Sequence, residues 1–198
     1  MTPRGRLLAF EGIDGCGKTT QARRVATLLD GLFTFEPGDT PLGASLRTLV
    51  LDPELPATAL AEVLIMAADR AQHLAEVIEP ALASGLDVVT DRYSGSTLAY
   101  QGYGRGIDLE DLRAVLAIAT GGATPDLTIL IDCPVDVAAA RREGGGDRFE
   151  DEAGGFLERV RRGFLALAAS DGWVVVDGSG PIGAVSAEVD AALSRTAT

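Results

Sequence analysis

A glycine-rich loop between a short apolar run and a helical stretch limits the folds that this chain can adopt more than any other feature. Residues 6–10 (RLLAF) have the composition of a buried strand, and residues 18–30 have that of a helix. Between them, residues 12–19 (GIDGCGKT) match the pattern G-x-x-x-x-G-K-[ST], in which glycines let backbone N–H groups turn toward phosphate oxygens. A helix that begins at the lysine adds the positive end of its dipole. The loop therefore predicts a binding site for a nucleoside triphosphate.

Two residues at the end of this loop have specific predicted contacts. We expect Lys18 to reach the β- and γ-phosphates of the nucleoside triphosphate and the hydroxyl of Thr19 to hold Mg²⁺. The other residues that we assign to the nucleotide are Gly12, Ile13, Asp14, Gly15, Cys16, Gly17 and Thr20. Cys16 could be a reactive thiol, because a helix N-terminus lowers a thiol pKa. The favoured interpretation is a small residue tolerated in a tight loop.

Short apolar runs alternate with helical stretches along the whole chain, which indicates an α/β fold. The predicted strands are residues 6–10, 32–37, 87–92, 127–132 and 173–178. The predicted helices are residues 18–30, 57–84 with a kink at Pro80, 94–102, 109–119, 135–142, 153–170 and 181–195. Continuous Val, Ile and Leu in the strands predicts a five-stranded parallel sheet between two helical layers, a three-layer sandwich of the P-loop NTPase type. We find no linker, so residues 1–198 are expected to form one domain.

Composition narrows the class of protein. The net charge is 17 − 29 = −12, which argues against nucleic acid or an anionic membrane as the main partner. No apolar run is long enough to span a membrane, and the N-terminus lacks the pattern of a secretory signal. Two cysteines do not make a disulfide framework. We therefore expect a globular protein located in the cytoplasm.

The distribution of positive charge separates the classes of protein that use nucleoside triphosphates. Lys18 is the only lysine, which excludes a GTPase that reads its base with an Asn-Lys-x-Asp segment. Motor and transporter ATPases are usually longer chains. A small phosphotransferase needs arginines around two bound phosphates and a lid that excludes water. Candidate arginines are Arg47, Arg70, Arg92, Arg141, Arg142 and Arg148, and residues 141–152 have the glycine-rich, charged composition of a lid. A kinase is the favoured class.

Several segments occur in order from about residue 7 to the last predicted strand, namely FEGIDGCGKTTQ, EPGDTPLGASLRTLVL, AADRAQH, DRYSGSTLAYQGYGRGID, TPDLTILID and DRFE. Together these segments resemble bacterial thymidylate kinases. The segment that begins DRY is more specific than the phosphate loop, which many families share. The resemblance implies transfer of a phosphoryl group from ATP to dTMP with Mg²⁺, giving dTDP, and it implies a homodimer formed through helices that flank the sheet.

The resemblance also implies roles for residues near the phosphates. Asp91 would hold Mg²⁺ together with Thr19, Arg92 would bind the acceptor phosphate, and Asp14 would approach that phosphate or its magnesium. In the lid, Arg148 with Arg141 and Arg142 would cover the triphosphate and stabilise the transferring phosphoryl group. Because the loop has Cys16 where some relatives have an arginine, the lid must supply that charge. The implied catalytic set is Lys18, Arg92, Asp14 and Arg148.

A second group of residues would bind the acceptor nucleotide. By resemblance, Arg70 would read the pyrimidine carbonyl, and Tyr100 would exclude a ribose 2′-hydroxyl. The full implied set is Glu36, Arg47, Met66, Arg70, Arg92, Ser96, Thr97, Tyr100 and Gln101. His73 is expected on the helix surface, outside the chemistry.

Two residues depart from the pattern of the family. Phe35 stands where many members have an arginine, and Met66 stands where a phenylalanine commonly stacks on the base. These departures keep an alternative open, namely a kinase for another pyrimidine nucleotide or for a deoxynucleoside. For a deoxynucleoside, Glu36 would be the base that accepts the sugar hydroxyl proton. A P-loop protein that binds nucleotides without efficient catalysis is the alternative from another class.

Overall fold

The computed structural model describes residues 3–141 and 155–195, which form a three-layer α/β fold around one parallel sheet. The strand order is β2-β3-β1-β4-β5, and every pair of neighbouring strands is parallel. The strands are β1 (Leu7–Glu11), β2 (Leu32–Phe35), β3 (Val88–Asp91), β4 (Leu127–Asp132) and β5 (Val174–Asp177). The five predicted strands and the predicted fold class are thus confirmed.

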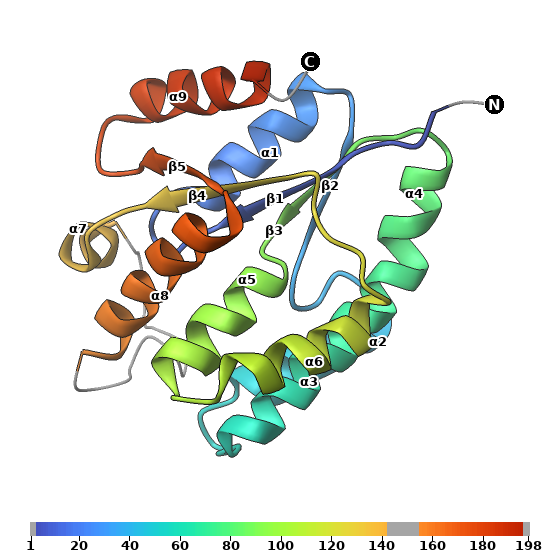
Figure 1. The fold of residues 1–198 in the computed structure, drawn as a ribbon, viewed down its shortest axis with the longest axis vertical. Helices are drawn as coiled ribbons and strands as arrows, with labels where there is room; N and C mark the ends of the chain where they lie inside the picture. Colours follow the sequence, from blue (N-terminus) through green and yellow to red (C-terminus); the bar gives the residue numbers. More distant parts are fainter. Residues whose placement is uncertain (1–2, 142–154, 196–198) are drawn as a thin grey trace.

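The helices of the described residues connect the strands and cover both faces of the sheet. They are α1 (Lys18–Leu28), α2 (Pro41–Leu51), α3 (Ala59–His73), α4 (Glu79–Ala83), α5 (Ser94–Thr97), α6 (Leu109–Thr120), α7 (Val135–Ala140), α8 (Phe156–Asp171) and α9 (Ile182–Arg195). Figure 1 shows α1 and α9 on one side of the sheet, with α5 and α8 on the other. No helix among the described residues is long and apolar enough to cross a membrane.

Strand β1 shows why its sequence is apolar at every position. Leu8 and Phe10 point to one face of the sheet and pack in the same cluster as Val25 of α1. Leu7 points to the other face and packs with Leu82 of α4. Successive side chains of a strand alternate between faces, so a strand covered on both sides needs continuous apolar residues.

Two predicted helices contain π-helical turns. The tract predicted as residues 57–84 consists of α3, a π-helical segment at Leu74–Ile78, and α4, and this segment lies directly before Pro80, where we expected a kink. The predicted helix at residues 94–102 consists of α5 and a second π-helical segment, Leu98–Gly104. Such turns often occur at functional sites, and the second one carries predicted acceptor-binding residues.

Helix α2 is not among the predicted helices. The side chain of Thr40 accepts a hydrogen bond from the backbone N–H of Gly43, and Pro41 occupies the first helical turn. Both features are signals for a helix start that the hydrophobic pattern alone does not reveal. The helix buries only Gly43 and Val50.

The topology places the candidate chemistry at one edge of the sheet. Strand β1 lies between β3 and β4, so the glycine-rich loop that follows it is central. The segments after β2 and β3 lie beside it, because parallel strands bring their carboxyl ends to the same edge. Apart from Arg141, the predicted lid lies outside the described residues.

Candidate active site

The phosphate loop joins β1 to α1 and depends on glycine at its start. Gly12 has φ 142°, and a Cβ atom there would lie 2.6 Å from the carbonyl oxygen of Ile131 and 2.8 Å from Cys16 Sγ. Gly17, with φ 96°, is the N-cap of α1. The loop can therefore wrap closely against β4 and direct the N-terminus of α1 toward a bound anion.

Three charged side chains meet at the mouth of this loop. Lys18 Nζ lies 3.0 Å from Asp14 Oδ1 and donates to the carbonyl oxygen of Ile13 at 3.4 Å. Arg92 Nη2 donates to the same Asp14 oxygen at 2.7 Å. Burial opposes the charge of Asp14, but Arg92 and Lys18 hold the pKa of this carboxyl well below its usual 3.8. The Asp14 carboxylate is therefore ionised whenever the protein is folded near neutral pH.

The electrostatics of the two cations follow from the same cluster. Burial and Arg92 act to lower the pKa of Lys18, but the carboxylates of Asp14 and Asp91 outweigh them and the pKa is raised. The pKa of Arg92 is likewise raised well above its usual value, chiefly because Asp14 overcomes the cost of burial. Both side chains thus keep full positive charge beside the loop, as the binding of phosphate requires.

Arg92 is held at the start of α5 by four acceptors. Its Nη1 donates to the carbonyl oxygen of Gly12 at 3.1 Å and to Ser96 Oγ at 2.9 Å. Its Nη2 contacts the Tyr100 hydroxyl at 3.4 Å, besides Asp14. The guanidinium carbon lies 5.2 Å from the centre of the Tyr100 ring. These contacts fix the plane of the guanidinium.

Thr19 and Asp91 form a pair suited to a hard cation. The Thr19 hydroxyl donates to Asp91 Oδ2. Asp91 Oδ1 is buried and has no hydrogen-bond partner within the described part of the chain. Burial of a carboxylate oxygen without a hydrogen-bond donor costs free energy unless a cation binds to that oxygen. Mg²⁺ prefers oxygen ligands. The donor set and the unpaired oxygen therefore fit the predicted magnesium contact.

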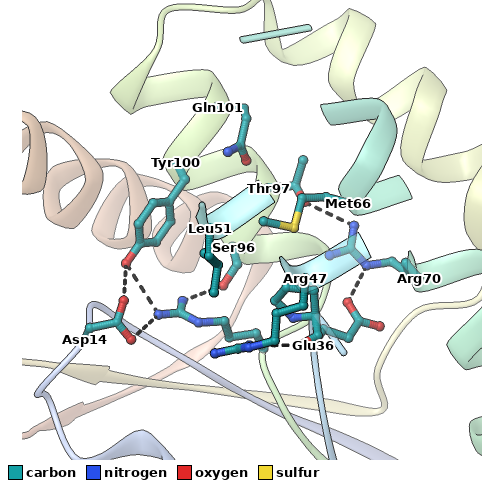
Figure 2. A pocket seen from close by; sticks show the side chains of 12 residues that line it. Asp14, Glu36, Arg47, Leu51, Met66, Arg70, Ser96, Thr97, Tyr100 and Gln101 are labelled. Carbon is teal, nitrogen blue, oxygen red and sulfur yellow. Dashed lines mark hydrogen bonds and ion pairs between the residues drawn. The ribbon is translucent and has the colours of Figure 1, made fainter. Parts of the chain in front are cut away.

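A pocket opens beside the phosphate loop, and it gathers the predicted acceptor-binding residues from five segments. It is lined by Asp14, Glu36, Pro37, Arg47, Leu51, Met66, Arg70, Arg92, Ser96, Thr97, Tyr100 and Gln101. All nine residues assigned to the acceptor from the sequence are in this set, and Pro37 and Leu51 were not predicted. Figure 2 shows Asp14 and Tyr100 at one end, with Arg70 and Glu36 at the other. The pocket thus has a phosphate-side end and a distal end.

Arg70 is buried and lines the distal end of the pocket. Its Nε donates to Glu36 Oε2 at 2.7 Å, and its Nη1 donates to Thr97 Oγ1 at 3.1 Å. Its Nη2 donates to the carbonyl oxygen of Tyr93 at 3.0 Å. Both side chains of the Arg70–Glu36 pair are 3% exposed. Arg70 is therefore not a solvated charge on a helix face.

The expectation that His73 lies on the helix surface was wrong. This side chain is completely buried, with Nδ1 2.9 Å from Glu36 Oε1 and Nε2 hydrogen-bonded to the Thr34 hydroxyl. His73 lies three positions after Arg70 on α3, so both side chains extend from the same face of the helix. The spacing from Arg70 is the signal in the sequence that could have placed His73 on the buried face.

Two further buried acids near the site were not predicted. Glu62 Oε2 accepts from Gln101 Nε2 at 3.3 Å, and Glu62 also pairs with Arg105. Glu11, the last residue of β1, accepts hydrogen bonds from Tyr93 and Ser96. Neither acid lines the pocket, and each contacts residues far away along the chain, so no local pattern identifies them.

On the nucleotide side, Arg141 lies against the loop that follows β5. It donates to the carbonyl oxygens of Gly178, Ser179 and Gly180 at 2.6, 2.7 and 3.2 Å. The other two lid arginines, Arg142 and Arg148, lie outside the described residues.

Cys16 is buried, and burial raises its thiol pKa. Burial and the raised pKa favour the interpretation of Cys16 as a small residue packed in a tight loop.

Comparisons with known proteins agree with this arrangement. A family model described as thymidylate kinase matches residues 10–189. The thymidylate kinase of Carboxydothermus hydrogenoformans is 49% identical over 182 residues, covering 88% of this chain and 90% of that protein. The thymidylate kinase of Prochlorococcus marinus is 48% identical over 204 residues, covering 96% of this chain and 94% of that protein.

A solved structure shares the same fold. The crystal structure of thymidylate kinase from Ehrlichia chaffeensis superposes with a TM-score of 0.80 at 33% sequence identity, and the match covers 97% of this chain and 99% of that one. Identity of nearly half over almost the full length, together with this structural match, places the sequence within one family. The chain belongs to the thymidylate kinase family.

Proposed function

We propose that the protein transfers the γ-phosphoryl group of ATP to dTMP, giving ADP and dTDP. One observation of the site carries this proposal. Lys18 of the phosphate loop and Arg92 of the pocket both contact Asp14 Oδ1, at 3.0 and 2.7 Å, so the two predicted phosphate sites adjoin. A triphosphate on the loop and a monophosphate in the pocket would then face each other. The family relationship identifies that monophosphate as dTMP.

The chemistry asks little of the protein besides position and charge. The attacking oxygen belongs to the acceptor phosphate and is already ionised, so no strong general base is required. As it bonds to the γ-phosphorus, the bond from that phosphorus to the β–γ bridging oxygen breaks, and ADP leaves with the electron pair. Lys18 and Arg92 stabilise the charge on the transferring group, and the loop N–H groups hold the triphosphate in line.

Thr19 and Asp91 are the residues that would hold Mg²⁺. The support is the buried Asp91 Oδ1, which lacks a partner within the described residues, next to the Thr19 hydroxyl. When bound, Mg²⁺ would neutralise charge on the β- and γ-phosphates.

The distal end of the pocket would read the base. Gln101 Nε2 donates to Glu62, which leaves the amide oxygen of Gln101 to accept a hydrogen bond in the pocket. Thymine carries a donor at N3, whereas cytosine carries an acceptor there. A guanidinium has five N–H donors, and three of those of Arg70 are engaged within the described residues, so two can face a carbonyl oxygen. Met66 and Leu51 add apolar surface.

A substrate panel tests this function. ADP release would be measured with dTMP, dUMP, dCMP, ribosyl-TMP and thymidine as acceptors, with Lys18→Met as the inactive reference. We expect the highest kcat/KM for dTMP and almost no hydrolysis without an acceptor. A preference for another monophosphate, or for thymidine, would favour the alternative kinases. ATP hydrolysis independent of any acceptor would favour the nucleotide-binding protein.

We further infer a cytoplasmic homodimer that forms through α3 and α6. Leu60 and Leu64 of α3 are 59% and 54% exposed, and Ile118 of α6 is 85% exposed. Figure 1 shows the two helices side by side. Light scattering should give a mass near twice the 20.5 kDa of one chain. Leu64→Glu should lower that mass to one chain, and an unchanged dimer would exclude this face.

A further inference from the structure

Arg92 adopts a backbone conformation that an ordinary side chain rarely takes. Its φ is 73°, and within the described residues only Asp30 is another non-glycine residue with positive φ. A left-handed conformation costs about 1–2 kcal/mol for a residue with a Cβ atom. Neighbouring contacts must therefore hold the backbone of Arg92 between β3 and α5. The N–H of Arg92 donates to the carbonyl oxygen of Phe10 at 2.9 Å, and its carbonyl oxygen accepts from the Thr90 hydroxyl at 2.8 Å.

Glu11, at the end of β1, holds the residues that follow Arg92. Its side chain is buried, and Oε1 accepts from the backbone N–H groups of Tyr93 at 3.0 Å and Ser96 at 3.1 Å. Helix α5 has no capping hydrogen bond from the side chain of its own N-cap residue, Tyr93. Glu11 thus satisfies N–H groups that the helix start leaves unpaired, although it lies more than eighty residues away along the chain.

Ser96 links Glu11 to the guanidinium of Arg92. The Ser96 hydroxyl has one proton, which it donates to Glu11 Oε2 at 2.5 Å. Its lone pairs therefore remain for Arg92, whose Nη1 donates to Ser96 Oγ at 2.9 Å. A guanidinium only donates and a carboxylate only accepts, so Ser96 accepts from Arg92 and donates to Glu11. The ionised Glu11 therefore keeps the Ser96 hydroxyl turned so that its lone pairs face Arg92, beside the other three acceptors of that guanidinium.

We infer that Glu11 is a positioning residue for phosphoryl transfer, which orients Arg92 through Ser96 and through the backbone at the start of α5. This inference rests on the proposed function, in which Arg92 binds the acceptor phosphate. Glu11 is buried and does not line the acceptor pocket. Its effect on the reaction must pass through Arg92.

The ionisation of Glu11 lies close to neutral pH. Burial raises its pKa to about 7, against the opposing effects of the Ser96 hydrogen bond, Arg92, the Tyr93 N–H group and Arg70. A protonated Glu11 would present an O–H to Ser96 in place of an acceptor, so the three donors that meet at its carboxylate would lose part of their acceptor set and the start of α5 would be held less firmly. Phosphoryl transfer should therefore weaken as pH falls below about 7. The acceptor phosphate also titrates near pH 6, so a variant must separate the two effects.

Glu11→Gln is the decisive variant because it keeps the shape and one acceptor oxygen but directs an amide N–H₂ toward Ser96. We expect kcat with dTMP to fall by about 10- to 100-fold, with KM for ATP unchanged. The remaining rate should lack the decline near pH 7 that is specific to wild type. Ser96→Ala should lower kcat similarly, and the double variant should be little worse than either single variant. Glu54→Gln, at an exposed loop position, is the control.

A second measurement does not depend on turnover. In arginine-labelled protein without nucleotides, NMR of the Nη groups reports whether rotation of the Arg92 guanidinium is restricted. We expect restricted rotation in wild type at pH 8, and faster rotation at pH 5.5 and in Glu11→Gln. Restricted rotation in Glu11→Gln, with unchanged kcat, would overturn the inference. Wild type with restricted Arg92 but no dTMP turnover would overturn the proposed function alone.

Discussion

Lys18 and Arg92 donate to one and the same oxygen atom, Asp14 Oδ1, at 3.0 and 2.7 Å. The two cations come from the loop after β1 and from the segment after β3, which are neighbouring strands. Without the carboxylate they would repel each other in a largely buried site. Asp14 therefore keeps Lys18 and Arg92 close together before the phosphates of the two substrates bind to them.

Asp14→Asn should destabilise the protein in the absence of nucleotides. The lowered pKa of Asp14 means that its contribution is present above the ordinary value of 3.8 and is lost only as pH falls through the lower folded-state pKa. At pH 7 we expect a loss of about 1–3 kcal/mol, because two buried cations lose their partner. Thermal unfolding measures this loss, and a saturating ATP analogue should restore part of it.

Asp190→Asn is the matched control for this variant. Asp190 pairs with Arg24 at 2.7 Å but is half exposed, so its loss should change the free energy of unfolding by about 0–1 kcal/mol. Equal effects of the two substitutions would mean that Asp14 is an ordinary surface ion pair.

Thr19→Val and Asp91→Asn should both raise the Mg²⁺ concentration needed for half-maximal rate. Each removes an oxygen ligand or the charge that supports it, while the pocket side chains stay in place. We expect a shift of about tenfold or more with KM for dTMP nearly unchanged. Titration of the rate with Mg²⁺ at fixed ATP measures the shift. Thr27→Val, at an exposed position on the same helix, should leave the titration as in wild type.

Tyr100 should exclude ribonucleotides by the bulk of its ring. The ring centre lies 6.1 Å from those of Phe156 and Phe164, which hold the ring edge-on. We expect Tyr100→Phe to keep the preference for dTMP over ribosyl-TMP, and Tyr100→Leu to reduce it about tenfold. The ratio of kcat/KM values for the two nucleotides is the measurement. Loss of preference in Tyr100→Phe would instead assign discrimination to the hydroxyl, which donates to Asp14 Oδ2 at 3.2 Å.

Asp69 should make the protein less stable at alkaline than at acidic pH. Burial, and then the charge of Glu36, raise the pKa of Asp69 to about 6, so the folded state binds a proton more tightly than the unfolded chain. Stability from this group is present below the unfolded value of 3.8 and is lost as pH rises through about 6. Asp69 Oδ2 is also buried and has no hydrogen-bond partner among the described residues.

Asp69→Asn removes this titration and keeps an oxygen for the N–H of Gly38. We expect the variant to be more stable than wild type by about 1–2 kcal/mol at pH 8, with a smaller difference at pH 4.5. Urea unfolding at the two pH values measures both differences. Glu76→Gln, on an exposed residue of the same helical tract, should show no such pH dependence. A constant difference for Asp69→Asn would contradict the raised pKa.

The fold and most of the pocket could be predicted from the sequence. The phosphate loop can be predicted because it depends on residues that are close together in the sequence. Gly12 and Gly17 adopt conformations that suit glycine, and Lys18 follows at a set spacing. The five strands can also be predicted, because strands that are buried on both faces need continuous apolar residues. The residues of the pocket were named through the resemblance to a family, and their roles there remain predictions.

The tertiary structure alone decided which buried groups support those residues. The hydrogen bond from Ser96 to Glu11, the burial of His73 against Glu36, and the contact of Gln101 with Glu62 each join segments far apart in the sequence. Local sequence patterns report propensity and amphipathicity, which are properties of neighbours along the chain. The partner of a buried polar side chain is set by the packing of distant elements, so it becomes visible only when the sheet and its helices are assembled.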